Sequence, residues 1–246
     1  MMESFAQVEE ASPREIQQHL IDKWRFIDNV LVFSRLIFIV APGDTIPGKL
    51  FTDKKERKLN MEGVVESYKT PEGVRIYSYV RLGEYYNKLA QELGKLKKEF
   101  WEKYNDLAIV VRDLPKYNYP VGLSQISTQR ILLSKAPGME IALRHELGHL
   151  VWPLLLQSTR DSIALLYQHM MREGGTLFKV LDEDQYFGFP KQVGQPYKNP
   201  GEMWASAWTI WEIRDKIDLS KLSPAEKQTF KILMEEIGRW KAPSQP

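Results

Sequence analysis

The pentapeptide His145-Glu146-Leu147-Gly148-His149 limits what this chain can fold into more than any other part of its sequence. Two histidines four positions apart lie on one face of an α-helix, one turn apart, and can bind the same zinc ion. Glu146 can take a proton from water held at that metal. The chain has only four histidines, so such a match arises by chance in well under about 1% of comparable chains. As ordinary buried histidines without a metal, the pair would leave costly unsatisfied polar groups.

A catalytic zinc site also needs a third protein ligand, and the chain offers two candidates. Glu202 falls in the first turn of a helix whose start is marked by Asn199-Pro200-Gly201, and the small residues Ala205 and Ser206 would let that helix approach the motif closely. On its own, a glutamate at a helix start is explained by the helix dipole, an effect of about 0.3–1 kcal/mol. His169, in another helical segment, is the alternative ligand. With the motif present, we expect Glu202 to complete the site.

At these residues the chain resembles the gluzincin metallopeptidases, over roughly Arg81 to Trp211. The run from Asn199 to Ala205 is most similar to the branch that includes the anthrax lethal factor catalytic domain and the Pro-Pro endopeptidases. The resemblance implies a zincin-like α+β fold that is helix-rich, with a small twisted mixed sheet and an active-site helix. It also implies a backing helix, a buried strand and an edge strand that pairs with a peptide or protein substrate. These would be Glu84–Tyr104, Leu107–Val111 and Arg130–Ser134, in that order.

The same resemblance implies roles for residues near the metal. In that branch a tyrosine shortly before the glutamate ligand stabilises the oxyanion, and Tyr197 is the nearest match, with Tyr186 as the fallback. Many gluzincins carry an acidic residue four positions after the ligand, where this chain has Ser206. A serine accepts a hydrogen bond from the imidazole more weakly, and losses of this kind cost about 10–100-fold in metal affinity or activity. Glu173 or Asp182 could supply the carboxylate instead.

Periodicity and turn signals place the remaining elements. An N-terminal extension with a helix and a strand is expected over residues 1–45, followed by a metallopeptidase domain over 46–246; one continuous domain over 13–241 is the alternative. Helices are expected over 84–104, 139–156 with a bend at Pro153, 161–171, 199–216 and 223–240; strands are expected over 30–40, 74–81, 107–111 and 130–134, and a loop over 183–201.

Composition narrows the class of partner. Lys and Arg nearly balance Asp and Glu, for a net charge of +2, which provides no strong field for binding nucleic acid. The apolar stretch Val30–Val40 is too short to span a bilayer and carries Arg35 at its centre, so we expect no membrane span. The absence of cysteine excludes thiolate zinc ligands. No targeting segment is evident, which favours a cytoplasmic protein, with secretion as the alternative.

Three functions fit these residues. The first is a zinc-dependent metallopeptidase, an endopeptidase rather than an exopeptidase, with Glu146 as general base and Tyr197 as oxyanion donor. The second is a catalytically weak or inactive zinc-binding module of the same fold that captures peptides or regulates, which the departure at Ser206 keeps open. The third is a regulatory protease of the kind that cleaves a repressor inside bacteria. Its relatives usually have a shorter spacing than that between His149 and Glu202 here.

Overall fold

The structure, a computed structural model, describes residues 31–32, 63–113, 122–126, 129–173, 175–182, 184–187, 196 and 198–241. The chain divides into two units, Met1–Leu31 and Val32–Pro246, and the description below concerns the second. Of the predicted N-terminal helix and the strand over 30–40, only β1 (Leu31–Val32) falls among the described residues. The predicted domain boundary at residues 45 and 46 lies outside them and stays a prediction.

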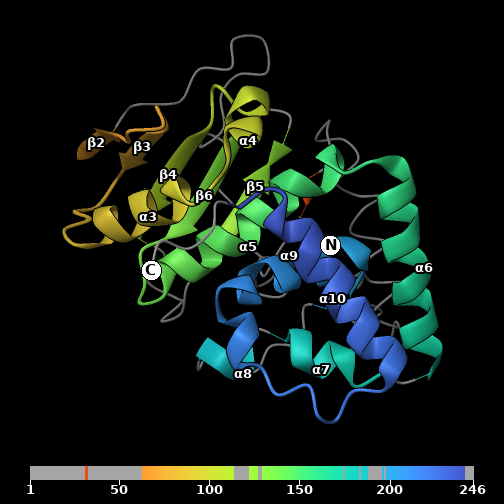
Figure 1. The fold of residues 1–246 in the computed structure, drawn as a ribbon. Coiled ribbons are helices and arrows are strands. Elements are labelled where there is room, and N and C mark those ends of the chain that lie inside the picture. The colour runs from red at the N-terminus through yellow and green to blue at the C-terminus, as the bar shows by residue number, and fades with distance from the viewer. Residues whose placement is uncertain are drawn as a thin grey trace, which may run out of the picture. The chain divides into compact units, whose positions relative to one another are not determined.

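A mixed β-sheet and a larger set of helices make up the described part of the second unit, so the chain is a mixed α/β protein (Figure 1). From Glu66 onward the strands are ordered β5-β6-β4-β3-β2. The β2–β3 and β5–β6 pairs are antiparallel, whereas β3–β4 and β4–β6 are parallel. The strands are β2 (Glu66–Lys69), β3 (Arg75–Ser78), β4 (Ala108–Arg112), β5 (Gly122–Gln125) and β6 (Arg130–Ser134).

Strand β6 lies inside this sheet. Leu132 of β6 pairs with Val110 of β4 on one side and with Leu123 of β5 on the other. A peptide can be added as a new strand only where a strand edge is unpaired. The prediction that Arg130–Ser134 is an edge strand that binds the substrate is therefore wrong. The sequence indicated strand-forming residues before residue 130 but not how they pair, so it did not reveal that β5 covers this edge.

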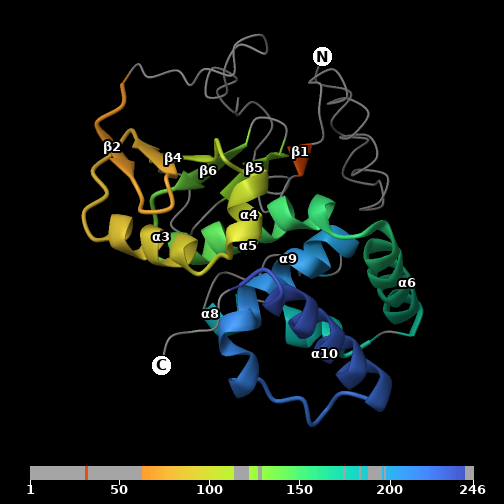
Figure 2. The same cartoon turned by 45° about the horizontal axis from the view of Figure 1, so that its top comes forward.

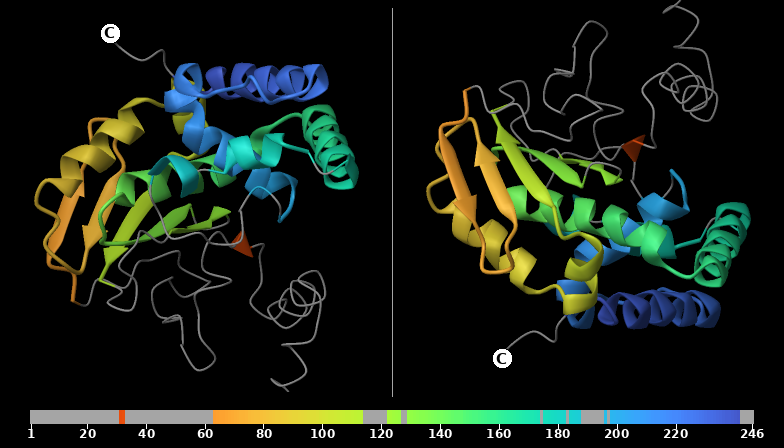
Figure 3. Two further views of the ribbon diagram at one scale, coloured as in Figure 1. Left: turned by 90° about the horizontal axis from the view of Figure 1, so that it is seen from below. Right: turned by 90° about the horizontal axis from the view of Figure 1, so that it is seen from above.

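Helix α5 (Met139–Val151) packs against both the sheet and other helices. In Figure 2 the sheet lies above α3 (Tyr85–Gly94) and α5, and α9 (Pro200–Ile210) lies below them, an arrangement that Figure 3 shows from two further sides. Helix α5 is thus enclosed between the sheet and α9. The other helical segments are α4 (Lys98–Lys103), η4 (Trp152–Leu154), α6 (Gln157–Glu173), α7 (Leu177–Leu181), α8 (Asp184–Phe187), η6 (Trp211–Lys216) and α10 (Pro224–Gly238).

The helix predicted over 84–104 is two helices, α3 and α4. After α3 ends at Gly94, Leu96 pairs with Lys241 in an antiparallel bridge, and the backbone N–H of Lys97 donates to the carbonyl of Trp240 at 2.9 Å. The predicted apolar stripe is nevertheless buried, with Leu89 and Phe100 fully enclosed. Periodicity found the buried face, but it could not reveal that a segment from the far end of the chain interrupts the helix.

Local helix signals were more reliable. Helix α5 ends at Val151 and Pro153 follows in the 3-10 turn η4, as expected from a proline that cannot continue the hydrogen-bond ladder. Helix α10 begins with the complete capping box of Ser223 and Glu226. Helix α6 is longer than predicted, and α7 had no expectation of its own. The loop predicted over 183–201 is wrong at its start, where α8 forms. Among the described residues, no helix combines the length and the apolar character needed to cross a bilayer.

Candidate metal centre

Helix α5 places the two histidines of the motif. It starts after Gly138, whose φ of 81° is readily adopted only by glycine, and runs without a break through both residues. His145 and His149 therefore lie one turn apart, with ring centroids separated by 4.8 Å. Each side chain is only 1% exposed, because α5 is covered on both sides. The motif is thus helical, as the sequence predicts, and its imidazoles are aimed into the protein.

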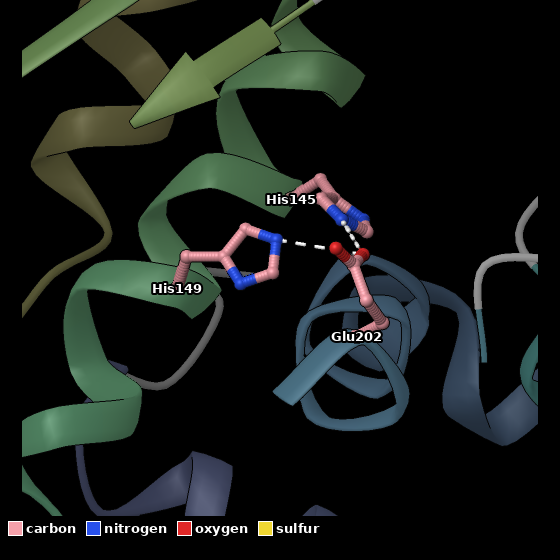
Figure 4. Close-up of side chains that lie close together, drawn as sticks. All are labelled: His145, His149 and Glu202. Atoms are coloured by element: carbon pink, nitrogen blue, oxygen red, sulfur yellow. Dashed lines mark hydrogen bonds and ion pairs between the residues drawn. The ribbon is translucent and has the colours of Figure 1, made fainter. Parts of the chain in front are cut away.

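Glu202 reaches this pair from α9. The side chain of Asn199 caps α9 by accepting a hydrogen bond from the backbone N–H of Glu202 at 2.9 Å, which fixes the first turn of the helix. The Oε2 atom of Glu202 then lies 3.1 Å from Nε2 of His145 and 3.5 Å from Nε2 of His149 (Figure 4). Glu202 is likewise 1% exposed. The structure therefore brings together the three residues that the sequence nominated as ligands.

Gly148, inside the motif, allows the two helices to come this close. A Cβ atom at position 148 would lie 2.9 Å from Cα of Ala205 and 3.0 Å from Cβ of Trp208, both on α9. The indole N–H of Trp204 donates to the carbonyl of Gly148 at 3.0 Å, which adds a hydrogen bond across the same contact. The small residue expected at Ala205 does face α5, but the partner glycine on α5 was not singled out from the sequence.

The electrostatics of the group also suit a cation. Burial by itself raises the pKa of Glu202, but the charge of His149 and the hydrogen bond with His145 outweigh it and hold that pKa well below its ordinary value. Neither ring nitrogen of His149 makes a hydrogen bond with any residue that the structure describes. Buried imidazole nitrogens are normally hydrogen-bonded, so a ring whose Nε2 has only the 3.5 Å ion-pair contact with Glu202 is suited to binding a cation.

The donor set fits a metal ion. Among the described residues, one group of nitrogen and carboxylate ligands lies close enough together to hold a single metal ion. It consists of His145, His149 and Glu202, whose ligand atoms all lie within 4.8 Å of one another. Two imidazoles and one carboxylate form a common catalytic zinc set, in which the fourth position is left for water or substrate. The group could therefore hold a metal ion.

Other predicted residues lie elsewhere. His169, the alternative ligand, is exposed on α6 and does not belong to the group. Tyr197 and the side chain of Glu173 fall outside the described residues, so their roles stay predictions. The hydroxyl of Tyr186 donates to the carbonyl of Val180 at 2.9 Å, so its proton is not directed at an oxyanion. Burial raises the pKa of Tyr186, and the nearby charge of Asp182 raises it further.

Ser206 does not take the place expected for it. Its side chain is fully buried on α9, yet its hydroxyl has no hydrogen-bond partner among the described residues, and neither does Nδ1 of His149. The predicted bond from Ser206 to a ligand imidazole is therefore not formed to His149.

Glu146 is fixed by strand β5. Its side chain is fully buried and lies directly against Gly122, the first residue of β5. A Cβ atom at position 122 would come within 2.6 Å of Oε1 of Glu146 and within 2.7 Å of its Cγ. The carboxylate therefore occupies the space that any side chain at position 122 would need. This glycine was not identified from the sequence, since no local pattern marks it.

The Gly122→Ala variant should consequently displace the Glu146 side chain. Because Glu146 is enclosed on α5, it has no exposed rotamer to move to, and overpacking of this kind costs about 1–3 kcal/mol of unfolding free energy. We expect the loss to shrink by more than half when Glu146 is also replaced by alanine, since the clash is then removed. A double-mutant cycle from urea denaturation measures this coupling. Equal losses in both backgrounds would contradict the contact.

The chain matches no family model, and neither a curated protein nor a solved structure matches it. The resemblance to gluzincins therefore depends on the sequence motifs at 145–149 and 199–205.

Proposed function

We propose that the chain is a zinc-dependent metallopeptidase with a zincin-like fold, and an endopeptidase in particular. The observation that supports this most is the convergence of Glu202, from a helix far along the chain, on the two imidazoles of an H-E-x-x-H motif. Metal sites of this composition with an intervening glutamate are typical of metal-assisted peptide hydrolysis. The gluzincin resemblance points to the same reaction.

In this proposal each residue of the site has a defined role. His145, His149 and Glu202 hold the ion, which when bound polarises a carbonyl and acidifies a water. Glu146 follows directly after His145 on α5 and is held by β5, so its carboxylate is pre-positioned for proton transfer. It takes a proton from the attacking water and later gives it to the amine that leaves. Tyr197 would stabilise the oxyanion, and a peptide or protein would be the substrate.

A second candidate, a metal-stabilised module without catalysis, is favoured by two observations. The three ligand side chains are each 1% exposed, and structural metal sites are closed whereas catalytic ones keep an accessible position. In addition, Nδ1 of His149 has no hydrogen-bond partner among the described residues, although catalytic zinc histidines are usually oriented by one. Such a module would bind the ion and capture peptides without cleaving them.

Metal analysis and a peptide-library digest test the proposal together. We expect the purified chain to bind one equivalent of zinc and to cleave a subset of library peptides, as seen by mass spectrometry. Chelation with 1,10-phenanthroline should abolish cleavage, and added zinc should restore it, because in this proposal the bound ion acidifies the attacking water. Bound zinc with no cleavage would support the second candidate. A chain that takes up no zinc when it is supplied would refute both.

A further inference from the structure

Five charged side chains form a continuous set of ion pairs outside the metal centre, and we call them the charge cluster. They come from four separate parts of the chain: helix α3 with the turn after it, helix α5, the 3-10 helix η6, and the segment that follows α10. The members of the charge cluster are Glu92, Lys95, Arg144, Glu212 and Lys241.

One end of the charge cluster is attached to α5. Arg144, which directly precedes His145, donates from Nε and Nη2 to the two carboxylate oxygens of Glu92 at 2.7 and 2.6 Å. Lys95 lies 2.8 Å from Glu92 and 3.6 Å from Glu212, so it links α3 to η6. Burial alone raises the pKa of Glu92, but the bonds with Arg144 and Lys95 overcome this and keep that pKa below its ordinary value.

The other end of the charge cluster is attached to α9. Lys241 is 3% exposed, and its Nζ lies 3.2 Å from Glu212 and donates to the carbonyl of Trp208 at 3.3 Å. The ammonium group also lies 5.1 Å from the ring centroids of both Trp208 and Trp211, within reach of a cation–π interaction. Burial lowers the pKa of Lys241 to about 8, and Glu212 works against this decrease. Lys241 thus pays a desolvation cost to hold this position.

Trp208 connects Lys241 to α5 and α9, the two helices that carry the candidate metal ligands. It lies in α9, the helix that carries Glu202, and its Cβ would be 3.0 Å from a Cβ at Gly148 in α5. The set of contacts therefore starts on α5 beside His145, passes through the charge cluster, and returns to α5 beside His149 by way of Trp208. It joins the two helices that supply the three ligands at a second place, apart from the ligands themselves.

Stability alone is a poor explanation for these buried charges. Replacing a buried ion pair with well-packed apolar side chains is often neutral or stabilising, because desolvation offsets the Coulomb attraction. What such a network does set is the relative position of the elements it joins, since each bond has a narrow range of distance and angle. A metal site needs that kind of control, because ligand atoms must lie within about 0.2 Å of their ideal distances.

We propose that Lys241 and Glu212 are positioning residues for the metal centre: they hold α9 against α5 so that Glu202 stays within reach of both histidines. This inference depends on the proposed metal site and goes beyond it, because it makes metal affinity a property of residues near the C-terminal end of the described chain. It also explains why Lys241 is drawn between two tryptophans instead of extending into solvent.

The Lys241→Met variant tests the proposal against a matched control, Lys97→Met. Lys97 holds the same C-terminal segment through a 2.8 Å bond from Nζ to the carbonyl of Gly238, but it is not a member of the charge cluster. We expect Lys241→Met to bind Co²⁺ and Zn²⁺ about 10–100-fold more weakly than the parent, the size of effect seen when support behind a ligand is lost. Lys97→Met should stay within about 2-fold of the parent.

Three measurements on the full chain decide the outcome: metal affinity by titration, the visible absorption of the Co²⁺ complex, and the melting temperature without metal. Weaker binding with an altered Co²⁺ spectrum for Lys241→Met alone supports positioning. Parental affinity and spectrum for that variant overturn it, as does equal weakening by Lys97→Met. If Lys241→Met does not fold, Glu212→Gln is expected to show the same loss, and its absence counts equally against the proposal. A parent chain that binds neither ion overturns the proposed function and this inference together.

Discussion

The Glu146→Gln variant is expected to bind zinc as tightly as the parent chain while its rate of peptide hydrolysis falls by about 10²–10⁴-fold. The amide has nearly the shape of the carboxylate, so it fits the enclosed space against Gly122 and leaves the two histidines in place. It can neither accept the proton of the attacking water nor deliver that proton to the leaving amine, so proton transfer is lost while metal binding is kept. Zinc content and kcat/KM for a peptide from the library digest are the two quantities to compare.

Two further variants make the Glu146 result specific. Glu140→Gln changes a partly exposed glutamate on the same helix and should leave both quantities unchanged. Glu202→Ala should instead lower metal affinity by more than about 100-fold, since loss of an outer partner of a ligand already costs about 10–100-fold. Undiminished cleavage by Glu146→Gln, with zinc bound, would remove this residue from the mechanism.

Gly148→Ala should damage the metal centre without touching a ligand. The new Cβ would lie 2.9 Å from the Cα of Ala205, a backbone atom that cannot rotate away, so α5 and α9 must separate. Alanine favours a helix over glycine by about 1 kcal/mol, but overpacking costs about 1–3 kcal/mol, so we expect a net loss of unfolding free energy of up to about 2 kcal/mol. Because ligand distances tolerate only about 0.2 Å, metal affinity should fall by at least about 10-fold.

Gly238→Ala provides the control for this prediction. Gly238 is also a helical glycine, the last residue of α10. A Cβ there would meet only the ring of Trp211 at 3.9 Å, which is an ordinary contact. The change should therefore leave metal affinity as it is and hold or raise the melting temperature. Titration with zinc and thermal unfolding of both glycine variants, without and with metal, give the comparison. Metal binding by Gly148→Ala at parental affinity would show that the close contact is not needed.

The parts of the site that the sequence predicted are those encoded locally. His145 and His149 are separated by one helical turn, so a helix across the motif is enough to align them. Glu202 could be nominated because Asn199 and Pro200 mark a helix start just before it, and the small Ala205 indicates a close helix contact. The structure brings these residues together through α5 and α9.

The parts that the sequence did not predict depend on contacts between distant segments. Gly122 lies against Glu146 because β5 crosses α5, and Gly148 lies against Ala205 because two helices dock; neither glycine has a local signature. The interior position of β6 depends on which strand pairs beside it, and strand order is not encoded in alternation. The bridge between Leu96 and Lys241 likewise interrupts a helix whose own pattern is continuous.

The separation of the ligands along the chain also bears on biosynthesis. His145 and Glu202 are 57 positions apart, so at a translation rate of roughly 5–20 residues per second the imidazole pair is synthesised several seconds before its carboxylate partner. During that interval the nascent chain offers a metal only a two-nitrogen, incomplete coordination shell. For the proposed metal centre, all three ligands are present only after α9 has been made and docks on α5, so we expect complete coordination to form late in maturation.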